Sequence, residues 1–227
     1  MTTELETYAN GRLLVPNGHF GDSDDATLIT VIEDFIDAED LELVYEYAKT
    51  ANMDYEGGLK GKMKDRVHTF EKFQTDSPTL FQLFKENYFL EIKNILEEKY
   101  GLELTEAFKC TELHKPLSES QEDKLAYMKI SSTCGCKSEI NPYIVAWTEG
   151  TDQQEHKDGS DFTAIIYLND DYQGGELNFP ESELNINPPA GSLIVWPGYL
   201  THGVSPVVSG TRYTMPIFLK AISVLSE

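Results

Sequence analysis

Residues 188–219 read PPAGSLIVWPGYLTHGVSPVVSGTRYTMPIFL, and this stretch carries the clearest signal of the fold class. The runs 192–196, 202–207 and 211–219 follow a period of two, and proline, glycine and serine separate them. A period of two is typical of strands, because successive side chains point to opposite faces of a sheet. The stretch therefore predicts short strands joined by tight turns.

The same pattern extends upstream to about Ala126. Many short strands with regular turn signals indicate a sandwich or barrel. We expect a mainly β chain with flanking helices (α+β), built around a double-stranded β-helix, or jelly roll. The further strands expected are 126–131, 142–148, 154–158, 162–168 and 175–179.

The amino-terminal part follows a helical period instead. Residues 29–35 alternate like a first strand, and Asp37 suits the N-cap of a helix. Pro78 suits the first turn of a second helix, which Gly101 would end. Between these helices, residues 51–75 are rich in glycine, lysine and aspartate and predict a mobile excursion.

This pattern predicts one domain over residues 1–227. Residues 1–125 would form a helical support region packed on the larger sheet, and residues 126–220 a jelly-roll core that carries the site.

The amino-acid composition argues against some classes of binding partner and cellular location. Eighteen Lys and Arg against 39 Asp and Glu give a net charge of −21, which repels phosphate backbones and argues against bulk binding of nucleic acid. The acidic start of the chain predicts no signal peptide, and no stretch has the apolar length of a membrane span. Three cysteines are too few and too uneven for a disulfide framework, so we expect a cytoplasmic protein.

Three residues suggest a metal site. His156 and Asp158 would share one face of a strand, while Lys157 points away. His202 would arrive from a later strand of the jelly roll. Imidazoles suit Fe, Zn, Ni or Cu, but two imidazoles with one carboxylate and open positions favour Fe(II). Structural zinc, by contrast, usually has four protein ligands.

Arg212 suggests an anion site beside the metal. It is one of three arginines in the chain, and residues 151–220 hold only two other basic side chains. Burying a guanidinium without an anionic partner is costly, whereas a carboxylate matches it well. Tyr167 could add a hydroxyl donor to the same carboxylate. The alternative for Arg212 is a structural ion pair with an Asp or Glu of the chain.

The carboxy-terminal segment resembles the Fe(II)/2-oxoglutarate-dependent dioxygenases, and within them the prolyl 4-hydroxylase-like branch. The motifs follow the family's order over roughly residues 142–220: HKD at 156–158, YLND at 167–170, GGELNFP at 174–180, PPAGSLIVWPG at 188–198, HGVSPV at 202–207 and GTRYTMPIF at 210–218. Arg212 replaces the lysine of collagen-type members, and Trp147 replaces a tyrosine that many members carry.

The resemblance implies a role for each matching residue. His156, Asp158 and His202 would bind Fe(II), while Arg212 and Tyr167 would bind the distal carboxylate of 2-oxoglutarate. Trp147 and Trp196 would line the site, and no catalytic residue beyond the metal ligands is implied. O2 is the second co-substrate, and the chemistry is compatible with ascorbate as an added reductant.

The implied reaction is hydroxylation of an unactivated C–H bond, with succinate and CO2 as co-products. A peptidyl proline is the acceptor that the motifs favour, so the partner would be a peptide or protein. Two alternatives stay open: the same chemistry on a small molecule or free amino acid, and a non-catalytic jelly-roll binding module.

Overall fold

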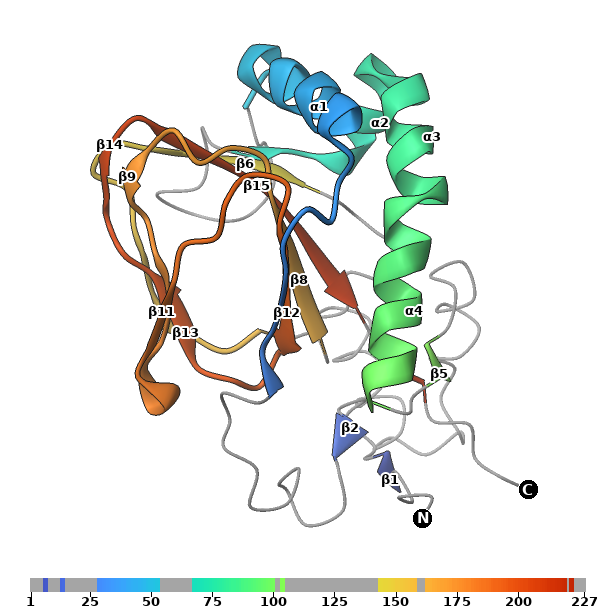
Figure 1. Ribbon diagram of the computed structural model, residues 1–227, viewed down its shortest axis with the longest axis vertical. Helices are drawn as coiled ribbons and strands as arrows, with labels where there is room; N and C mark the ends of the chain where they lie inside the picture. The colour runs from blue at the N-terminus through green and yellow to red at the C-terminus, as the bar shows by residue number, and fades with distance from the viewer. Residues whose placement is uncertain are drawn as a thin grey trace, which may run out of the picture.

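The computed structural model describes residues 6–7, 13–14, 28–53, 67–100, 103–104, 143–158, 162–219 and 221–222. Within this part, two sheets face each other and helices cover the outer side of the larger sheet (Figure 1). None of the helices described is long and apolar enough to cross a lipid bilayer.

The larger sheet has six antiparallel strands in the order β3-β12-β8-β15-β6-β4. Their bounds are Thr30–Ile32 (β3), Leu193–Pro197 (β12), Phe162–Tyr167 (β8), Thr211–Leu219 (β15), Ile144–Thr148 (β6) and Val67–His68 (β4). The register of β15 sets Arg212 opposite Trp147 on β6 and Thr214 opposite Tyr167 on β8. These three central strands therefore bring together the side chains that the sequence singled out.

The smaller sheet has four strands in the order β11-β10-β13-β7. Their bounds are Leu184–Ile186 (β11), Leu177–Phe179 (β10), His202–Val204 (β13) and Gln153–His156 (β7). Three further pairs complete the strands: β14 (Val207–Ser209) with β9 (Gln173–Gly174), β1 (Glu6–Thr7) with β2 (Leu13–Leu14), and β16 (Ala221–Ile222) with β5 (Glu103–Leu104). Two opposed antiparallel sheets in this order form the expected jelly roll, so the predicted fold class is confirmed.

The helices are α1 (Ala38–Thr50), α2 (Phe70–Asp76), α3 (Pro78–Glu86) and α4 (Tyr88–Tyr100), with a 3-10 turn, η4, at Pro180–Ser182. The helices pack on the sheet face formed by every second residue of its strands. Ile166, Leu193 and Val195 face the helices and share a core with Val44 of α1 and Phe84 of α3. The helices thus cover the outer side of the larger sheet, as the sequence predicted.

The alternate residues of these strands point the other way, into the space between the two sheets. Tyr167, Ile194 and Trp196 pack there against Leu177 and Phe179 of the smaller sheet. This inner space contains the candidate site.

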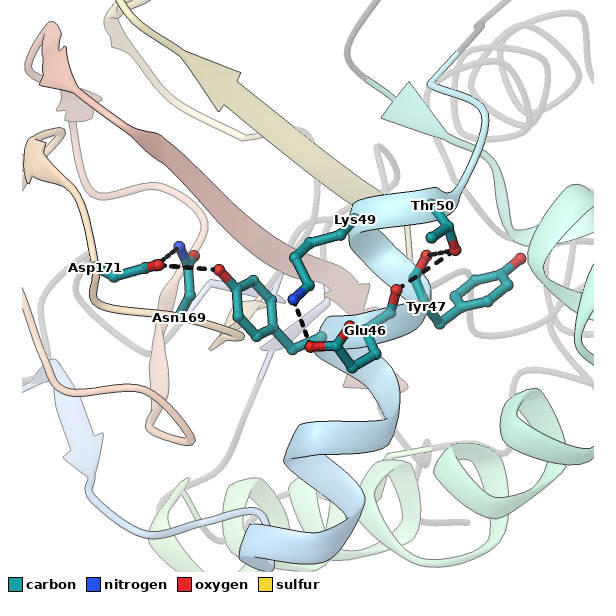
Figure 2. Close-up of polar contacts among 7 residues, drawn as sticks. Glu46, Tyr47, Lys49, Thr50, Asn169 and Asp171 are labelled. Atoms are coloured by element: carbon teal, nitrogen blue, oxygen red, sulfur yellow. Dashed lines mark hydrogen bonds and ion pairs between the residues drawn. The ribbon is translucent and has the colours of Figure 1, made fainter.

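One polar contact ties α1 to the turn that follows β8 (Figure 2). The Tyr45 hydroxyl donates to the Asp171 carboxylate at 3.1 and 3.2 Å, and the Asn169 amide donates to the same carboxylate at 2.5 Å. Asn169 also accepts from the backbone N–H of Tyr213 at 2.7 Å. The YLND motif therefore has a structural role at its polar end, because it joins α1, β8 and β15.

The structure corrects the predicted elements at several points. The long helix from Pro78 is interrupted at Asn87, since asparagine favours turns over helix interiors. The predicted excursion over 51–75 contains β4 and most of α2, while its residues 54–66 lie outside the described residues.

The remaining corrections concern strands. The predicted strand 202–207 is two strands, β13 and β14, which belong to different sheets. Most of the predicted strand 175–179 is β10, and β11 was not predicted. The predicted strand 126–131 lies outside the described residues.

Candidate active site

Three side chains meet between the sheets at one end of the smaller sheet. Ligand atoms of His156, Asp158 and His202 all lie within 4.8 Å of one another. His156 Nε2 is 3.5 Å from Asp158 Oδ1, and His202 Nε2 is 3.4 Å from Asp158 Oδ2. The two histidines are directly opposite each other on β7 and β13, with ring centroids 4.3 Å apart. The structure thus brings together the three residues that the sequence predicted as ligands.

Asp158 reaches this cluster by a route that the sequence did not predict. The expected strand 154–158 ends at His156, so Asp158 lies beyond the regular alternation of β7. Its backbone N–H donates to the Gly198 carbonyl at 2.8 Å, and its Oδ2 accepts from Thr163 Oγ1 at 2.5 Å. Tertiary hydrogen bonds, and not strand parity, therefore place the carboxylate.

The histidines have their Nε2 atoms directed at the cluster. His156 Nδ1 is 2.9 Å from the Gln154 carbonyl, and His202 Nδ1 is 3.0 Å from the Leu200 carbonyl. A carbonyl only accepts, so each Nδ1 carries the proton and each neutral Nε2 keeps its lone pair for a ligand. Gln153, which the sequence did not single out, donates its amide to His156 Nε2 at 3.0 Å.

The three groups have shifted pKa values with different causes. The Asp158 carboxylate, 3.5 Å from His156 Nε2, favours the protonated form of His156 and raises its pKa, whereas burial lowers the pKa of His202. Burial opposes ionisation of Asp158, but the nearby His156 and His202 outweigh it and lower its pKa. The site is therefore one carboxylate anion beside two imidazoles, a donor set that fits Fe(II).

Arg212 is fully buried and has no carboxylate partner among the described residues. Its Nη2 donates to the Tyr167 hydroxyl at 2.8 Å, while Nε and Nη1 have no hydrogen-bond partner there. The guanidinium carbon lies 4.7 Å from the Tyr167 ring centroid and 5.7 Å from that of Trp147. Two unpaired donors on a buried cation fit the carboxylate of a ligand such as 2-oxoglutarate.

Tyr172 is a neighbour of Arg212 that the sequence reasoning missed. Burial raises its pKa to about 12 against the opposing influence of Arg212, and its hydroxyl donates to Asn187 Oδ1 at 2.7 Å. Gly175 leaves room on the same side, since a Cβ there would lie 3.1 Å from Arg212 Cδ. Tyr172 sits in a turn, where the alternation that revealed Arg212 gives no signal.

The two tryptophans lie at different parts of the inner space. Trp196 packs edge-on against His202, with centroids 4.9 Å apart. Trp147 packs on Arg212, and its Nε1 donates to Thr214 Oγ1 at 3.3 Å. Trp196 thus lies beside the predicted ligands, and Trp147 beside the predicted co-substrate site. Lys157 is exposed, as expected for its position between His156 and Asp158.

Comparison with known proteins gives the family of this segment. Residues 143–220, which hold the cluster and Arg212, match the family model of the 2OG-Fe(II) oxygenase superfamily. The match confirms the predicted resemblance, and that family implies Fe(II), 2-oxoglutarate and O2.

Curated relatives of this oxygenase segment are named PKHD-type hydroxylases. One from Synechococcus sp. (strain JA-2-3B'a(2-13)) is 36% identical over 63 residues, 27% of this chain and 28% of the relative. One from Xylella fastidiosa (strain M12) is 42% identical over 57 residues, 23% of this chain and 25% of the relative. The chain thus spans about a quarter of the length of these relatives.

The solved structures that match this chain include two prolyl hydroxylases. The viral collagen prolyl hydroxylase vCPH from Paramecium Bursaria Chlorella virus-1 has 15% sequence identity and a TM-score of 0.47, covering 88% of this chain and 99% of that one. A Pseudomonas putida prolyl-4-hydroxylase has 14% identity and a TM-score of 0.49, covering 88% and 96%.

Proposed function

We propose that this chain is an Fe(II)- and 2-oxoglutarate-dependent dioxygenase that hydroxylates an unactivated C–H bond, with a peptidyl proline as the acceptor. Arg212 is the observation that carries the proposal. It is a fully buried cation with two unpartnered N–H donors, in the segment that matches the oxygenase family. A co-substrate with a carboxylate at one end and a metal-chelating group at the other satisfies both Arg212 and the cluster.

Under this proposal the chain's own residues hold and orient the reactants. His156, Asp158 and His202 hold Fe(II) through two neutral imidazoles and one carboxylate. Arg212 and Tyr167 hold the distal carboxylate of 2-oxoglutarate; the Tyr167 oxygen accepts from Arg212, which leaves its O–H to donate to the ligand. Fe(II) and 2-oxoglutarate, when bound, supply the activation of O2 and the oxidising power for a C–H bond, with succinate and CO2 as co-products.

The inner walls keep water away from this chemistry. Phe179 and Trp196 are almost completely buried and pack against His202. No general base or nucleophile is required, so no catalytic side chain beyond the ligands is proposed.

A groove beside the histidine strands supports a polymeric acceptor. It has a volume of about 750 Å³, and its lining includes residues just before His156 (Gln153 to Glu155) and just after His202 (Gly203 to Ser205). Glu183 also lines it, and none of its lining residues is cationic. His156, Asp158 and His202 do not line this groove, but it lies on the two strands that carry the histidines, and its size suits a peptide segment that flanks the acceptor. The hydroxylase names of the curated relatives support the proposed type of reaction.

The test is production of succinate from 2-oxoglutarate that depends on added Fe(II), with proline-containing peptides as acceptors. We expect a peptide product that has gained one oxygen atom, and no succinate from folded His156→Ala or Asp158→Ala variants. Turnover on free amino acids with no peptide product would favour the small-molecule alternative. A folded wild-type chain that binds no divalent metal would favour the binding module.

A cytoplasmic location and the absence of bulk nucleic-acid binding are proposed from the net charge and the low cysteine count.

A further inference from the structure

Thr163 joins the larger sheet to the candidate metal site. It lies on β8, is 1% exposed, and donates its hydroxyl to Asp158 Oδ2 at 2.5 Å. Asp158 itself follows β7 of the smaller sheet. One hydrogen bond therefore connects a central strand of one sheet to the carboxylate that lies at the end of the other.

This hydrogen bond makes the two oxygens of Asp158 unequal. Oδ2 accepts from Thr163 and lies 3.4 Å from His202 Nε2, whereas Oδ1 lies 3.5 Å from His156 Nε2. A hydroxyl bound to Oδ2 resists rotation of the carboxylate and withdraws electron density from that oxygen. Oδ1 is thus the better ligand for a metal ion held by the histidines.

We infer that Thr163 is a positioning residue that restricts Asp158 to binding the metal through one oxygen. The inference rests on the proposed function of the site. A carboxylate can bind a metal through one oxygen or both. If both oxygens of Asp158 bound, the protein would fill four of six octahedral positions and a chelating co-substrate the other two. Single-oxygen binding keeps a position open for O2.

Burial of the Thr163 hydroxyl does not by itself explain why it donates to the Asp158 carboxylate. Thr151 is also buried, and its Oγ1 donates to the Thr148 carbonyl at 2.6 Å, an ordinary neutral acceptor in a turn. Thr163 instead donates to the Asp158 carboxylate, and hydrogen bonds to an ionised group are roughly twice as strong. Such partners of metal ligands orient the ligand and tune the metal.

The test compares Thr163→Val, which keeps the shape without the hydroxyl, with Thr163→Ser, which keeps the hydroxyl. Mn²⁺ is titrated into the metal-free chain of residues 1–227, and the Kd is measured by calorimetry and by electron paramagnetic resonance. We expect Thr163→Val to weaken Mn²⁺ binding by about 10–100-fold and Thr163→Ser to stay close to wild type. The infrared carboxylate bands of the Mn²⁺ form should shift toward the two-oxygen pattern in Thr163→Val alone.

Thr151→Val is the matched control, because it also removes a buried hydroxyl that donates a hydrogen bond. It should lower Tm by about 2–4 °C and leave the Mn²⁺ Kd unchanged. Should Thr163→Val not fold, Thr163→Ala and Thr163→Ser provide the same comparison.

The inference is overturned if the valine or alanine variant binds Mn²⁺ with the wild-type Kd and wild-type carboxylate bands. Failure of the proposed function looks different. In that case the wild-type chain itself binds no Mn²⁺, or His202→Ala leaves its Mn²⁺ binding unchanged.

Discussion

Arg212 donates to the Tyr167 hydroxyl across the adjacent strands β15 and β8, at 2.8 Å, and both side chains are fully buried. The hydroxyl is a neutral acceptor, so the contact does not neutralise the guanidinium. A buried charge left in this way costs stability unless an anion arrives. The Arg212–Tyr167 pair is therefore better suited to binding an anionic ligand than to stabilising the fold.

Replacing Arg212 should separate stability from co-substrate binding. In the absence of 2-oxoglutarate, Arg212→Met should leave Tm unchanged or raise it, because an uncompensated buried charge is removed. The same change should raise the 2-oxoglutarate requirement by about 10–100-fold or more, since each charge-assisted hydrogen bond contributes about 1.5–3 kcal/mol. Thermal unfolding and succinate production measure the two effects. Lys157→Met, at an exposed cation, is the control, and an unchanged 2-oxoglutarate dependence in Arg212→Met would remove the assigned role.

The Tyr45–Asp171 contact predicts a pH-dependent contribution of α1 to stability (Figure 2). Hydrogen bonding from Asn169, with further help from Tyr45, lowers the pKa of Asp171 below 3.8. The contribution is present above the unfolded pKa and is lost as pH falls through the folded pKa. Tyr45→Phe should thus cost about 0.5–1 kcal/mol at neutral pH. Urea unfolding at several pH values should show the difference from wild type shrinking as Asp171 protonates; a constant difference would contradict this account.

Gly203 keeps the two histidine strands close together. A Cβ at this position would lie 3.0 Å from the Gln153 carbonyl oxygen and 3.3 Å from the Glu155 nitrogen, both backbone atoms of β7. Gly203→Val should therefore push β7 from β13, separate His156 from His202 and weaken Mn²⁺ binding by at least about tenfold.

The control for Gly203 is Gly150→Ala, where a Cβ would meet nothing within 4 Å but φ is +76°. It should cost about 1 kcal/mol in stability through backbone strain and leave the Mn²⁺ Kd as in wild type. Equal Mn²⁺ affinity in Gly203→Val and wild type would show that the strand spacing does not control the cluster.

The groove predicts a preference for cationic peptides. Glu155 and Glu183 line it without any cationic side chain among its lining residues. Lysine near the acceptor should lower the KM of a peptide several-fold, and the preference should fade at high salt because exposed charges are screened. The double variant Glu155→Gln/Glu183→Gln should lose the preference and retain turnover of neutral peptides. Equal KM values for lysine- and glutamate-flanked peptides would rule out this role of the groove.

Much of the fold was predictable because the relevant signals are local. Alternation over 211–219 placed Arg212 on a strand, and glycine and proline marked the turns on both sides. The helix break at Asn87 and the division of 202–207 into β13 and β14 were missed. Asn87 and Ser205-Pro206 stand at these two points and favour turns, but the prediction followed the apolar residues on both sides of them.

Some features of the candidate site were likewise determined by the sequence alone, and others only by the tertiary structure. The sequence alone determined the residue types of the site: two imidazoles, a carboxylate, a scarce arginine and a nearby tyrosine, in an order that matches the oxygenase motifs. Only the tertiary structure determined that Asp158 lies beyond its strand, held by Gly198 and Thr163, and that Tyr172 lies beside Arg212. The reason is physical. Periodicity records which face a side chain takes within its own strand, whereas a hydrogen bond between distant segments depends on how the two sheets meet.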